Sequence, residues 1–224
     1  MSGYGAAFEA WRAASPSWGA YTRHAFVEGL KDGTLPRASF LHYLKQDYVF
    51  LIHFSRAWAL AVAKADTLDE MRACAATVNA LVDEEMRLHV GICAEAGIDE
   101  AALEATVEAA ENLAYTRYVL EAGYSGGFLP LLAALAPCVL GYGEIGARLA
   151  VEKTSDEYAD WIATYGGEPC QNLCRDVGAM IDGALARRLG PGFADAPLFD
   201  SLAKTFETAA RLEVGFWDMG LRGA

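Results

Sequence analysis

The chain has 224 residues, 54% of them hydrophobic, and a formal net charge of −12 at pH 7. This length suits one large domain with a substantial core, and we expect a single domain over residues 1–224. The acidic charge argues against nucleic acid as a partner, because phosphate binding needs basic residues. With no uninterrupted apolar run of about 18 residues and no signal peptide, we expect a soluble protein with no membrane partner. Five scattered cysteines fit a reducing cytoplasm better than a disulfide framework.

Helix-forming residues dominate the chain from end to end. Alanine is abundant, proline is scarce and runs of β-branched residues are missing, which predicts an all-α, single-domain helical bundle. The expected helices, in chain order, are residues 17–30, 37–65, 68–96, 99–122, 126–151, 156–165, 169–189 and 197–221. Glycine or proline separates most of them. Pro137 falls inside the fifth helix and is expected to bend it.

Cys138 has the most unusual surroundings in the sequence. It follows Pro137 in the run L-A-P-C-V-L-G-Y-G-E-I-G, with Tyr142 one helical turn later and Glu144 just beyond. Nucleophilic catalysis by a cysteine needs a thiol with neighbouring groups that move its proton, and a phenol and a carboxyl group are such groups. Free cysteine is also among the most buried residue types, so this run alone is more typical of a structural cysteine in a helical core.

Two carboxyl groups interrupt helix faces that are otherwise apolar. Asp47 shares a face with leucine and aromatic residues of the second helix, where an unpaired carboxylate costs several kcal/mol. It either pairs with a residue such as Arg56 or Lys64, or binds a ligand that carries hydrogen-bond donors. Glu213 lies on an aromatic face of the last helix, and such a setting raises a carboxyl pKa toward the range of a general acid at pH 7.

Polar residues on other helices strengthen the case for a site. Tyr115 lies on the fourth predicted helix and Tyr165 ends the sixth. Each residue alone is more often part of a core than of a site. Inward-facing polar residues on several helices, with a thiol on another, are how helix bundles build their sites.

Two motifs resemble well-known sites and are rejected. Gly141–Gly146 matches G-x-G-x-x-G and Asp160 follows about 20 residues later, but the dinucleotide motif needs a preceding strand and this region is helical. We expect these glycines to allow close helix packing or close approach of a ligand. Cys170 and Cys174 are one turn apart without partnering ligands, so they do not predict a zinc site.

Glu85 and His89 lie four residues apart on one predicted helix face. Di-iron bundles use Glu-x-x-His on each of two helices, so this spacing is one residue too long and has no second copy. We therefore expect a surface or packing role for the pair and no metal in the protein. The other histidines are isolated and are expected to be structural: His24, His42 and His53.

The combination of motifs resembles the TenA family, also called thiaminase II, which has a haem-oxygenase-like helical fold. The matching segments follow the family's order and extend over nearly all of the chain. They are H-A-F-V-E-G-L-K-D-G-T-L-P, F-L-H-Y-L-K-Q-D-Y, P-C-V-L-G-Y-G-E-I-G, W-I-A-T-Y-G-G and E-V-G-F-W. The D-G-T-L-P turn together with the cysteine-tyrosine motif is specific, and Cys138 places the chain in the cysteine-bearing branch.

The resemblance implies hydrolysis of 4-amino-5-aminomethyl-2-methylpyrimidine to the 5-hydroxymethyl compound and ammonia, in thiamine salvage. It also implies cleavage of thiamine itself, no cofactor, and a homotetramer. Cys138 would be the nucleophile that adds to the ring, and Glu213 would shuttle protons. The resemblance assigns substrate binding to Asp47, Tyr115, Tyr142, Tyr165, Phe50 and Phe216. Asp47 would accept hydrogen bonds from the 4-amino group and the adjacent ring nitrogen.

The chain departs from the family at one position. Many members have tyrosine where this chain has Phe50, and the missing hydroxyl bears on substrate preference, because sites that bond a polar group discriminate strongly. Two other functions remain open at this point. One is a metal-dependent oxidase on the same fold that uses Glu85 and His89. The other is a regulatory protein that acts indirectly on transcription, since the charge of −12 argues against direct DNA contact.

Overall fold

Helices account for the regular structure of the part of the chain that the computed structural model describes, residues 3–223. No β-strand forms within these residues, so the all-α prediction is confirmed. The helices are α1 Ala6–Ala14, α2 Trp18–Thr22, α3 Ala25–Asp32, α4 Arg37–Lys64, α5 Leu68–Asn79, the π-helix η1 Ala80–Glu85, α6 Met86–Glu95, α7 Glu100–Glu104, α8 Ala110–Ser125, α9 Phe128–Glu152, α10 Ala159–Gly166, α11 Glu168–Leu189, the short 3₁₀-helix η2 Phe193–Asp195 and α12 Pro197–Arg222.

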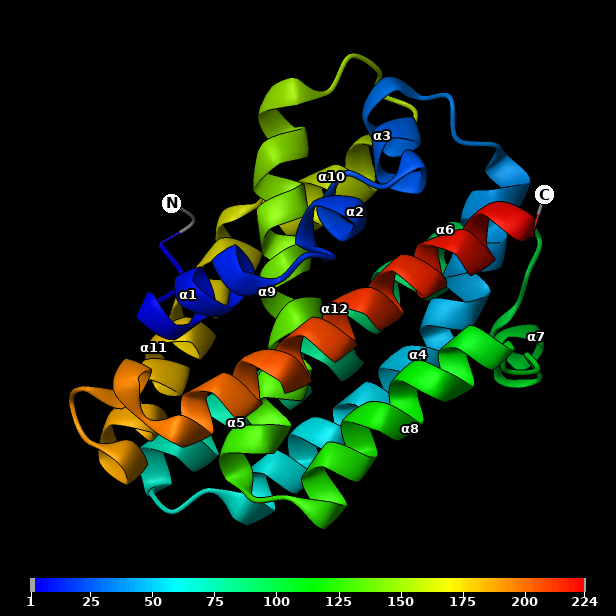
Figure 1. Cartoon of the computed structure of the whole chain (residues 1–224). Helices are drawn as coiled ribbons and strands as arrows, with labels where there is room; N and C mark the ends of the chain where they lie inside the picture. The colour runs from blue at the N-terminus through cyan, green and yellow to red at the C-terminus, as the bar shows by residue number, and fades with distance from the viewer. Residues whose placement is uncertain (1–2, 224) are drawn as a thin grey trace.

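Four long helices build the body of the molecule. α4, α8 and α12 run side by side, and α9 packs across them from behind (Figure 1). α10 and α11 pack against α9, while α5 packs against both α4 and α11. Large aromatic side chains such as Trp58, Trp161 and Trp217 are fully buried where these helices meet. The centre of the bundle is therefore reached by side chains from most of the helices.

α9 is long and apolar enough to cross a membrane if length and composition alone are considered. However, 78% of its most apolar stretch is buried inside the protein. Core helices of soluble proteins have this composition because they are surrounded by other helices. α9 is such a helix, and it passes through Pro137 without ending.

The N-terminal helix α1 was not predicted, because the residue that caps it is distant in the sequence. The backbone N–H groups of Ala6 and Ala7 donate to the two carboxylate oxygens of Asp182 on α11, at 2.7 and 2.9 Å. A capping acceptor normally comes from the residue just before the helix, and that position is Gly5. A local sequence pattern does not contain this start signal.

Three predicted helices are interrupted. The segment 17–30 breaks at His24, whose extended backbone and Nδ1 acceptor cap α3 through the N–H of Phe26 at 3.2 Å. The segment 99–122 breaks before α8, where the side chain of Gln46 accepts from the N–H of Ala109 and donates to the carbonyl of Val107, each at 2.9 Å. The segment 68–96 remains helical but changes to π geometry at η1. Caps and tertiary contacts thus override helix propensity at these points.

The glycines of the G-x-G-x-x-G run allow neighbours to approach α9 closely, as predicted. A Cβ on Gly141 would overlap the ring of Tyr21, and one on Gly143 would overlap the sulfur of Cys174. A Cβ on Gly146 would overlap the backbone at Tyr165. The run is inside a helix and no strand precedes it within the described residues, so it is not a dinucleotide-binding motif.

Replacing Gly146 by alanine is expected to destabilise the fold, because the added methyl group meets the backbone of α10 rather than a movable side chain. Overpacking of this kind costs about 1–3 kcal/mol. Gly183→Ala on α11 is the matched control, since its Cβ would meet no atom within 4 Å. Alanine should stabilise that exposed position by about 0.5–1 kcal/mol. Chemical unfolding measures both effects, and equal stabilities for the two variants would contradict the packing role of Gly146.

Candidate active site

The thiol of Cys138 lies in the middle of α9, near the carboxyl group of Glu213 on α12, whose charge acts on it. Burial raises the pKa of Cys138 well above its ordinary value, and nearby carboxylates raise it further. The resting thiol is therefore protonated, and it needs a base to become a nucleophile. Glu213 lies near it and is placed to be that base.

Glu213 is buried at the junction of four helices. The hydroxyl of Tyr115 on α8 donates to its Oε1 at 2.8 Å, and the hydroxyl of Tyr21 on α2 bonds to it as well. Burial raises the pKa of Glu213 to about 8, although the Tyr115 hydrogen bond opposes this shift. This agrees with the expectation from its aromatic helix face. A carboxyl group with such a pKa takes up and releases a proton close to neutral pH.

Asp47 is buried on α4, and its hydrogen bonds are not those of a structural ion pair with arginine or lysine. The Tyr43 hydroxyl donates to Oδ2 at 2.8 Å, and Nε2 of His89 lies 2.7 Å from the same oxygen. Arg56 and Lys64, the partners considered from the sequence, contact other groups instead. Both hydrogen bonds that the described residues make to Asp47 end on Oδ2.

Of the surface and packing roles expected for Glu85 and His89, the surface role is wrong for His89, and both residues also bond to other members of the site. His89 is fully buried against Asp47, and its Nδ1 lies 2.8 Å from the carbonyl oxygen of Glu85. The hydroxyl of Tyr165 on α10 donates to Oε1 of Glu85 at 2.5 Å. Burial, with the charge of Asp47, raises the pKa of Glu85 to about 7. Their spacing was visible in the sequence, but the contact with Asp47 joins residues 42 positions apart.

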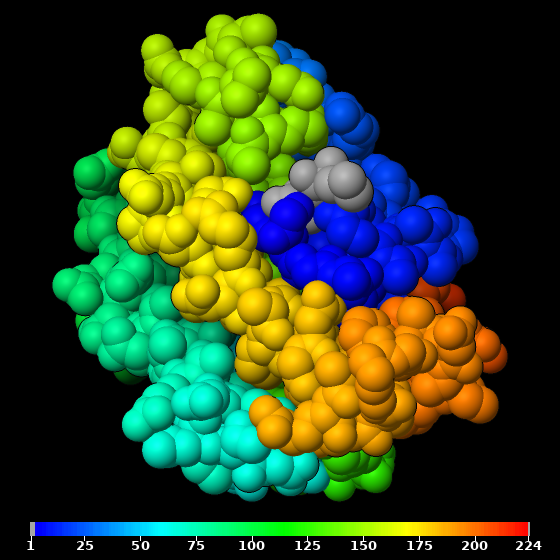
Figure 2. All heavy atoms as spheres, turned by 90° about the vertical axis from the view of Figure 1, so that its left-hand side faces the viewer, coloured from blue at the N-terminus to red at the C-terminus, as the bar shows by residue number. Residues whose placement is uncertain are grey.

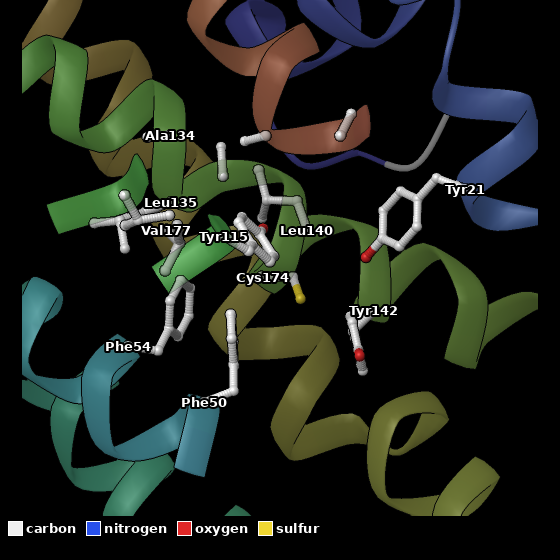
Figure 3. Packing of buried hydrophobic residues seen from close by; sticks show 14 of the residues in the cluster. Tyr21, Phe50, Phe54, Tyr115, Ala134, Leu135, Leu140, Tyr142, Cys174 and Val177 are labelled. Atoms are coloured by element: carbon white, nitrogen blue, oxygen red, sulfur yellow. The ribbon is translucent and has the colours of Figure 1, made fainter. Parts of the chain in front are cut away.

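Aromatic rings form the walls between these groups. Phe50 lies between Tyr115 and Phe216, with ring centres 5.1 and 5.3 Å away. Tyr142 contacts Tyr165 at 5.1 Å between ring centres and is hydrogen-bonded to Tyr43. In Figure 3, Phe50 is directed toward Tyr115, and the hydroxyl end of Tyr21 lies near Tyr142.

The structure brings all the sequence-predicted site residues into one connected cluster. Tyr43 joins its two halves, since it bonds to both Asp47 and Tyr142 and its ring contacts Phe216 at 6.2 Å. Tyr21 and Tyr43 were not predicted as site residues, because buried tyrosines are common in helical cores. Tyr43 precedes Asp47 by one helical turn, and this spacing was the available signal.

A cavity of about 550 Å³ borders the cluster between α5–η1 and α10–α11. Its walls include Asn79, Glu84, Glu85, Tyr165 and Asp176. In Figure 2 the residues of α5, η1 and α6 (cyan to green) border those of α10 and α11 (yellow) on this side of the molecule. The cavity thus reaches the Glu85–Tyr165 hydrogen bond at the edge of the cluster.

The arrangement does not favour metal binding. Across residues 3–223, no group of three or more His, Cys, Asp or Glu side chains is arranged to hold a metal ion. Glu85 and His89 are engaged with Tyr165 and Asp47. Cys174 packs against α9, where its sulfur bonds to the carbonyl of Val139 at 3.4 Å. The carboxyl oxygens of Asp47 and Glu213 accept hydrogen bonds, so they suit a ligand that carries N–H donors.

Sequence and structure comparisons relate this site to known proteins. A family model described as "TENA/THI-4/PQQC family" matches residues 11–223. The chain belongs to the TENA/THI-4/PQQC family. This confirms the resemblance found in the sequence and accounts for nearly the whole chain.

Individual TENA/THI-4/PQQC relatives match over most of their length. The crystal structure of a protein from a Silicibacter species, described as a TenA family transcription regulator, is 65% identical, with a TM-score of 0.97 and 99% of both chains covered. An aminopyrimidine aminohydrolase of Halalkalibacterium halodurans is 35% identical over 209 residues, which cover 92% of this chain and 91% of the relative. A TenA homologue from P. horikoshii is 26% identical, with a TM-score of 0.85 and coverage of 97% and 99%.

Proposed function

We propose that this chain is an aminopyrimidine hydrolase of thiamine salvage. Its substrate is 4-amino-5-aminomethyl-2-methylpyrimidine, and its products are the 5-hydroxymethyl compound and ammonia. The observation that carries the proposal is the nearness of the buried Cys138 thiol to the carboxyl group of Glu213, which Tyr115 holds, with Asp47 in the same aromatic cluster. The Halalkalibacterium halodurans relative, which carries the name of this activity, supports it.

The proposed reaction uses Cys138 as the nucleophile and Glu213 as the group that moves protons. Glu213 accepts the proton of Cys138, and the sulfur bonds to the ring carbon beside the one that bears the aminomethyl group. Glu213 then protonates the neighbouring ring nitrogen. The electron pair of the 4-amino group moves into the ring and expels the ammonium substituent as ammonia.

Water then adds to the remaining methylene carbon and gives a proton to Glu213. Glu213 returns this proton to the Cys138 sulfur as the carbon–sulfur bond breaks, and the ring nitrogen loses its proton to Glu213 as the ring becomes aromatic again. The released ammonia takes up that last proton, which leaves Glu213 ionised for the next turnover.

Asp47 and the aromatic walls bind the ring in this scheme. The 4-amino group becomes positively charged as its electron pair moves into the ring, and an anionic carboxylate beside it stabilises that charge. Phe50 and Phe216 supply apolar surface for the ring faces. Phe50 has no hydroxyl, so in this chain Tyr21 and Tyr115 provide the hydroxyl groups around Glu213.

The charge of the adjoining cavity favours a cationic substituent at position 5. Its walls carry the carboxyl groups of Glu84, Glu85 and Asp176, and none of the described residues that line it is lysine, arginine or histidine. An ammonium group or the thiazolium ring of thiamine would be attracted to this acidic surface, whereas a neutral formylamino group would not.

Formation of the common 5-hydroxymethyl product from the aminomethyl, formylaminomethyl and thiamine substrates, compared side by side, tests the proposal, because the three compounds release different groups, namely ammonia, formamide and the thiazole. We expect the aminomethyl compound to be hydrolysed with the highest kcat/KM, and the rate to be the same with and without a chelator. Absence of turnover with all three compounds would contradict the proposed function. A rate that requires added metal would favour the oxidase alternative instead.

A regulatory role has one supporting observation, the description of the Silicibacter relative as a transcription regulator. The formal charge of −12 disfavours direct contact with DNA phosphates. The buried thiol and carboxyl pair has no use in such a role, so we prefer the hydrolase. The homotetramer implied by the family resemblance is retained as part of the proposal.

A further inference from the structure

The proton arrangement around His89 is restricted by its two neighbours. The carbonyl oxygen of Glu85 only accepts hydrogen bonds, so Nδ1, 2.8 Å away, carries a hydrogen. Nε2 lies 2.7 Å from Oδ2 of Asp47, which already accepts from the Tyr43 hydroxyl. If Asp47 is ionised, Nε2 must also carry a hydrogen, and the ring is an imidazolium. His89 is fully buried, so this charge is shielded from water and faces the carboxylate directly.

The charges around His89 favour the imidazolium. The titratable groups that face it are Asp47 and Tyr43 on α4 and Glu85 on η1, with Tyr165 of α10 behind Glu85. Burial alone lowers the pKa of His89, but its hydrogen bond to Asp47 and the charges of Asp47 and Glu85 raise it above the ordinary value. A buried carboxylate that must stay ionised is stabilised by such a cation.

The helical segment η1, whose last residue bonds to His89, has an unusual geometry. η1 is a π-helix, a geometry that is rare and is frequently found at functional sites. Its last residue, Glu85, uses its carbonyl group for His89 and its carboxyl group for Tyr165. One residue therefore supports both Asp47 and Tyr165, which are two of the proposed substrate-binding residues on different helices.

We infer that His89 is a positioning residue, an imidazolium fixed by the Glu85 carbonyl, which holds Asp47 through its Oδ2 and leaves its Oδ1 available to the 4-amino group of the substrate. This inference rests on the proposed aminopyrimidine hydrolysis. His89 touches neither the substrate nor the reacting atoms. It acts through Asp47, whose Oδ2 it occupies together with Tyr43.

Nitrogen-15 NMR of histidine-labelled protein tests the charge of the ring directly. The chain has four histidines, and the signal that disappears in His89→Gln identifies the one in question. We expect both of its nitrogens to be protonated at pH 7.5, and the ring to lose its proton at higher pH than the other histidines. A neutral His89 with an unprotonated Nε2 would overturn the inference, and this experiment on the unaltered protein does not depend on the folding of any variant.

Kinetics of His89→Gln test the consequence for the site. Glutamine keeps one N–H donor but no charge, and a hydrogen bond to a charged group is worth about 10- to 100-fold in affinity. We expect KM for the aminopyrimidine to rise by about this factor, and kcat to fall as well, because Asp47 also stabilises the positive charge that develops on the 4-amino group. The acid limb of the kcat/KM profile, which Glu213 sets, should stay in place.

His42→Gln is the matched control, since His42 lies on the same helix as Asp47 but packs against Gly223. It should leave KM and the pH profile unchanged. An unchanged KM and kcat in His89→Gln would overturn the inference while the hydrolase proposal stands. Failure of the unaltered protein to release ammonia would instead remove the proposed function, and the NMR result would still report the charge of His89.

Discussion

Replacing Cys138 by serine is expected to stop ammonia release from the aminopyrimidine while leaving the protein folded and able to bind the ring. A serine hydroxyl is a far weaker nucleophile than a thiolate at neutral pH, and Glu213 is too weak a base to ionise it. Removal of a catalytic nucleophile lowers kcat by about a thousandfold or more. Ammonia release and calorimetric binding of the 5-hydroxymethyl product measure the two expectations separately.

Cys170→Ser is the control for the loss of a thiol, because Cys170 lies at the cavity wall and is not hydrogen-bonded to Glu213. It should retain the activity of the unaltered protein. Near-native turnover by Cys138→Ser would exclude a covalent intermediate on this residue. Loss of product binding together with activity would point to a packing role for the cysteine instead.

Glu213→Gln is expected to lower kcat much more than it changes KM. Glutamine has nearly the same shape and still accepts the hydrogen bond of Tyr115, but it neither takes nor returns a proton. General acid–base catalysis contributes about 10²- to 10⁴-fold, and this sets the expected loss. Steady-state kinetics between pH 6 and 10 measure it.

The pH profile adds a second expectation for Glu213. Burial raises the pKa of this group to about 8, and it must lose its proton before it can accept that of Cys138. The kcat/KM of the unaltered protein should therefore rise through about pH 8. The pH profile of Glu213→Gln should lack this rise, which is the acid limb of the profile. Asp218→Asn, a change at a half-exposed carboxylate of the same helix, is the control and should keep the limb. Equal losses in binding and rate for Glu213→Gln would indicate a role in recognition only.

The sequence predicted the long helices well, because their patterns are long and their ends are marked locally. The segments 37–65, 126–151 and 197–221 correspond to α4, α9 and α12 within two residues at each end. Errors occurred where the signal was not local. Asp182 caps α1 from the other end of the chain, and Gln46 holds the loop before α8. No window of neighbouring residues contains these contacts.

The sequence indicated those site residues whose burial costs the most free energy, namely the two carboxyl groups. Asp47 and Glu213 stood out because a carboxyl group on an apolar helix face needs an explanation. Tyr43 and His89 did not, since tyrosine and histidine are often buried for packing alone. Their importance lies in the atoms they contact, and those contacts depend on how α4, η1 and α6 pack together.

The cluster around Cys138 draws on helices from α2, near the start of the chain, to α12, at its end. Tyr21 and Glu213 meet although nearly the whole sequence lies between them. A partly folded chain that had formed only its N-terminal or only its C-terminal helices would hold no complete set of reacting groups. Activity in this protein therefore appears only with complete folding, and a destabilising substitution anywhere in the bundle lowers the active fraction rather than producing a weakened enzyme.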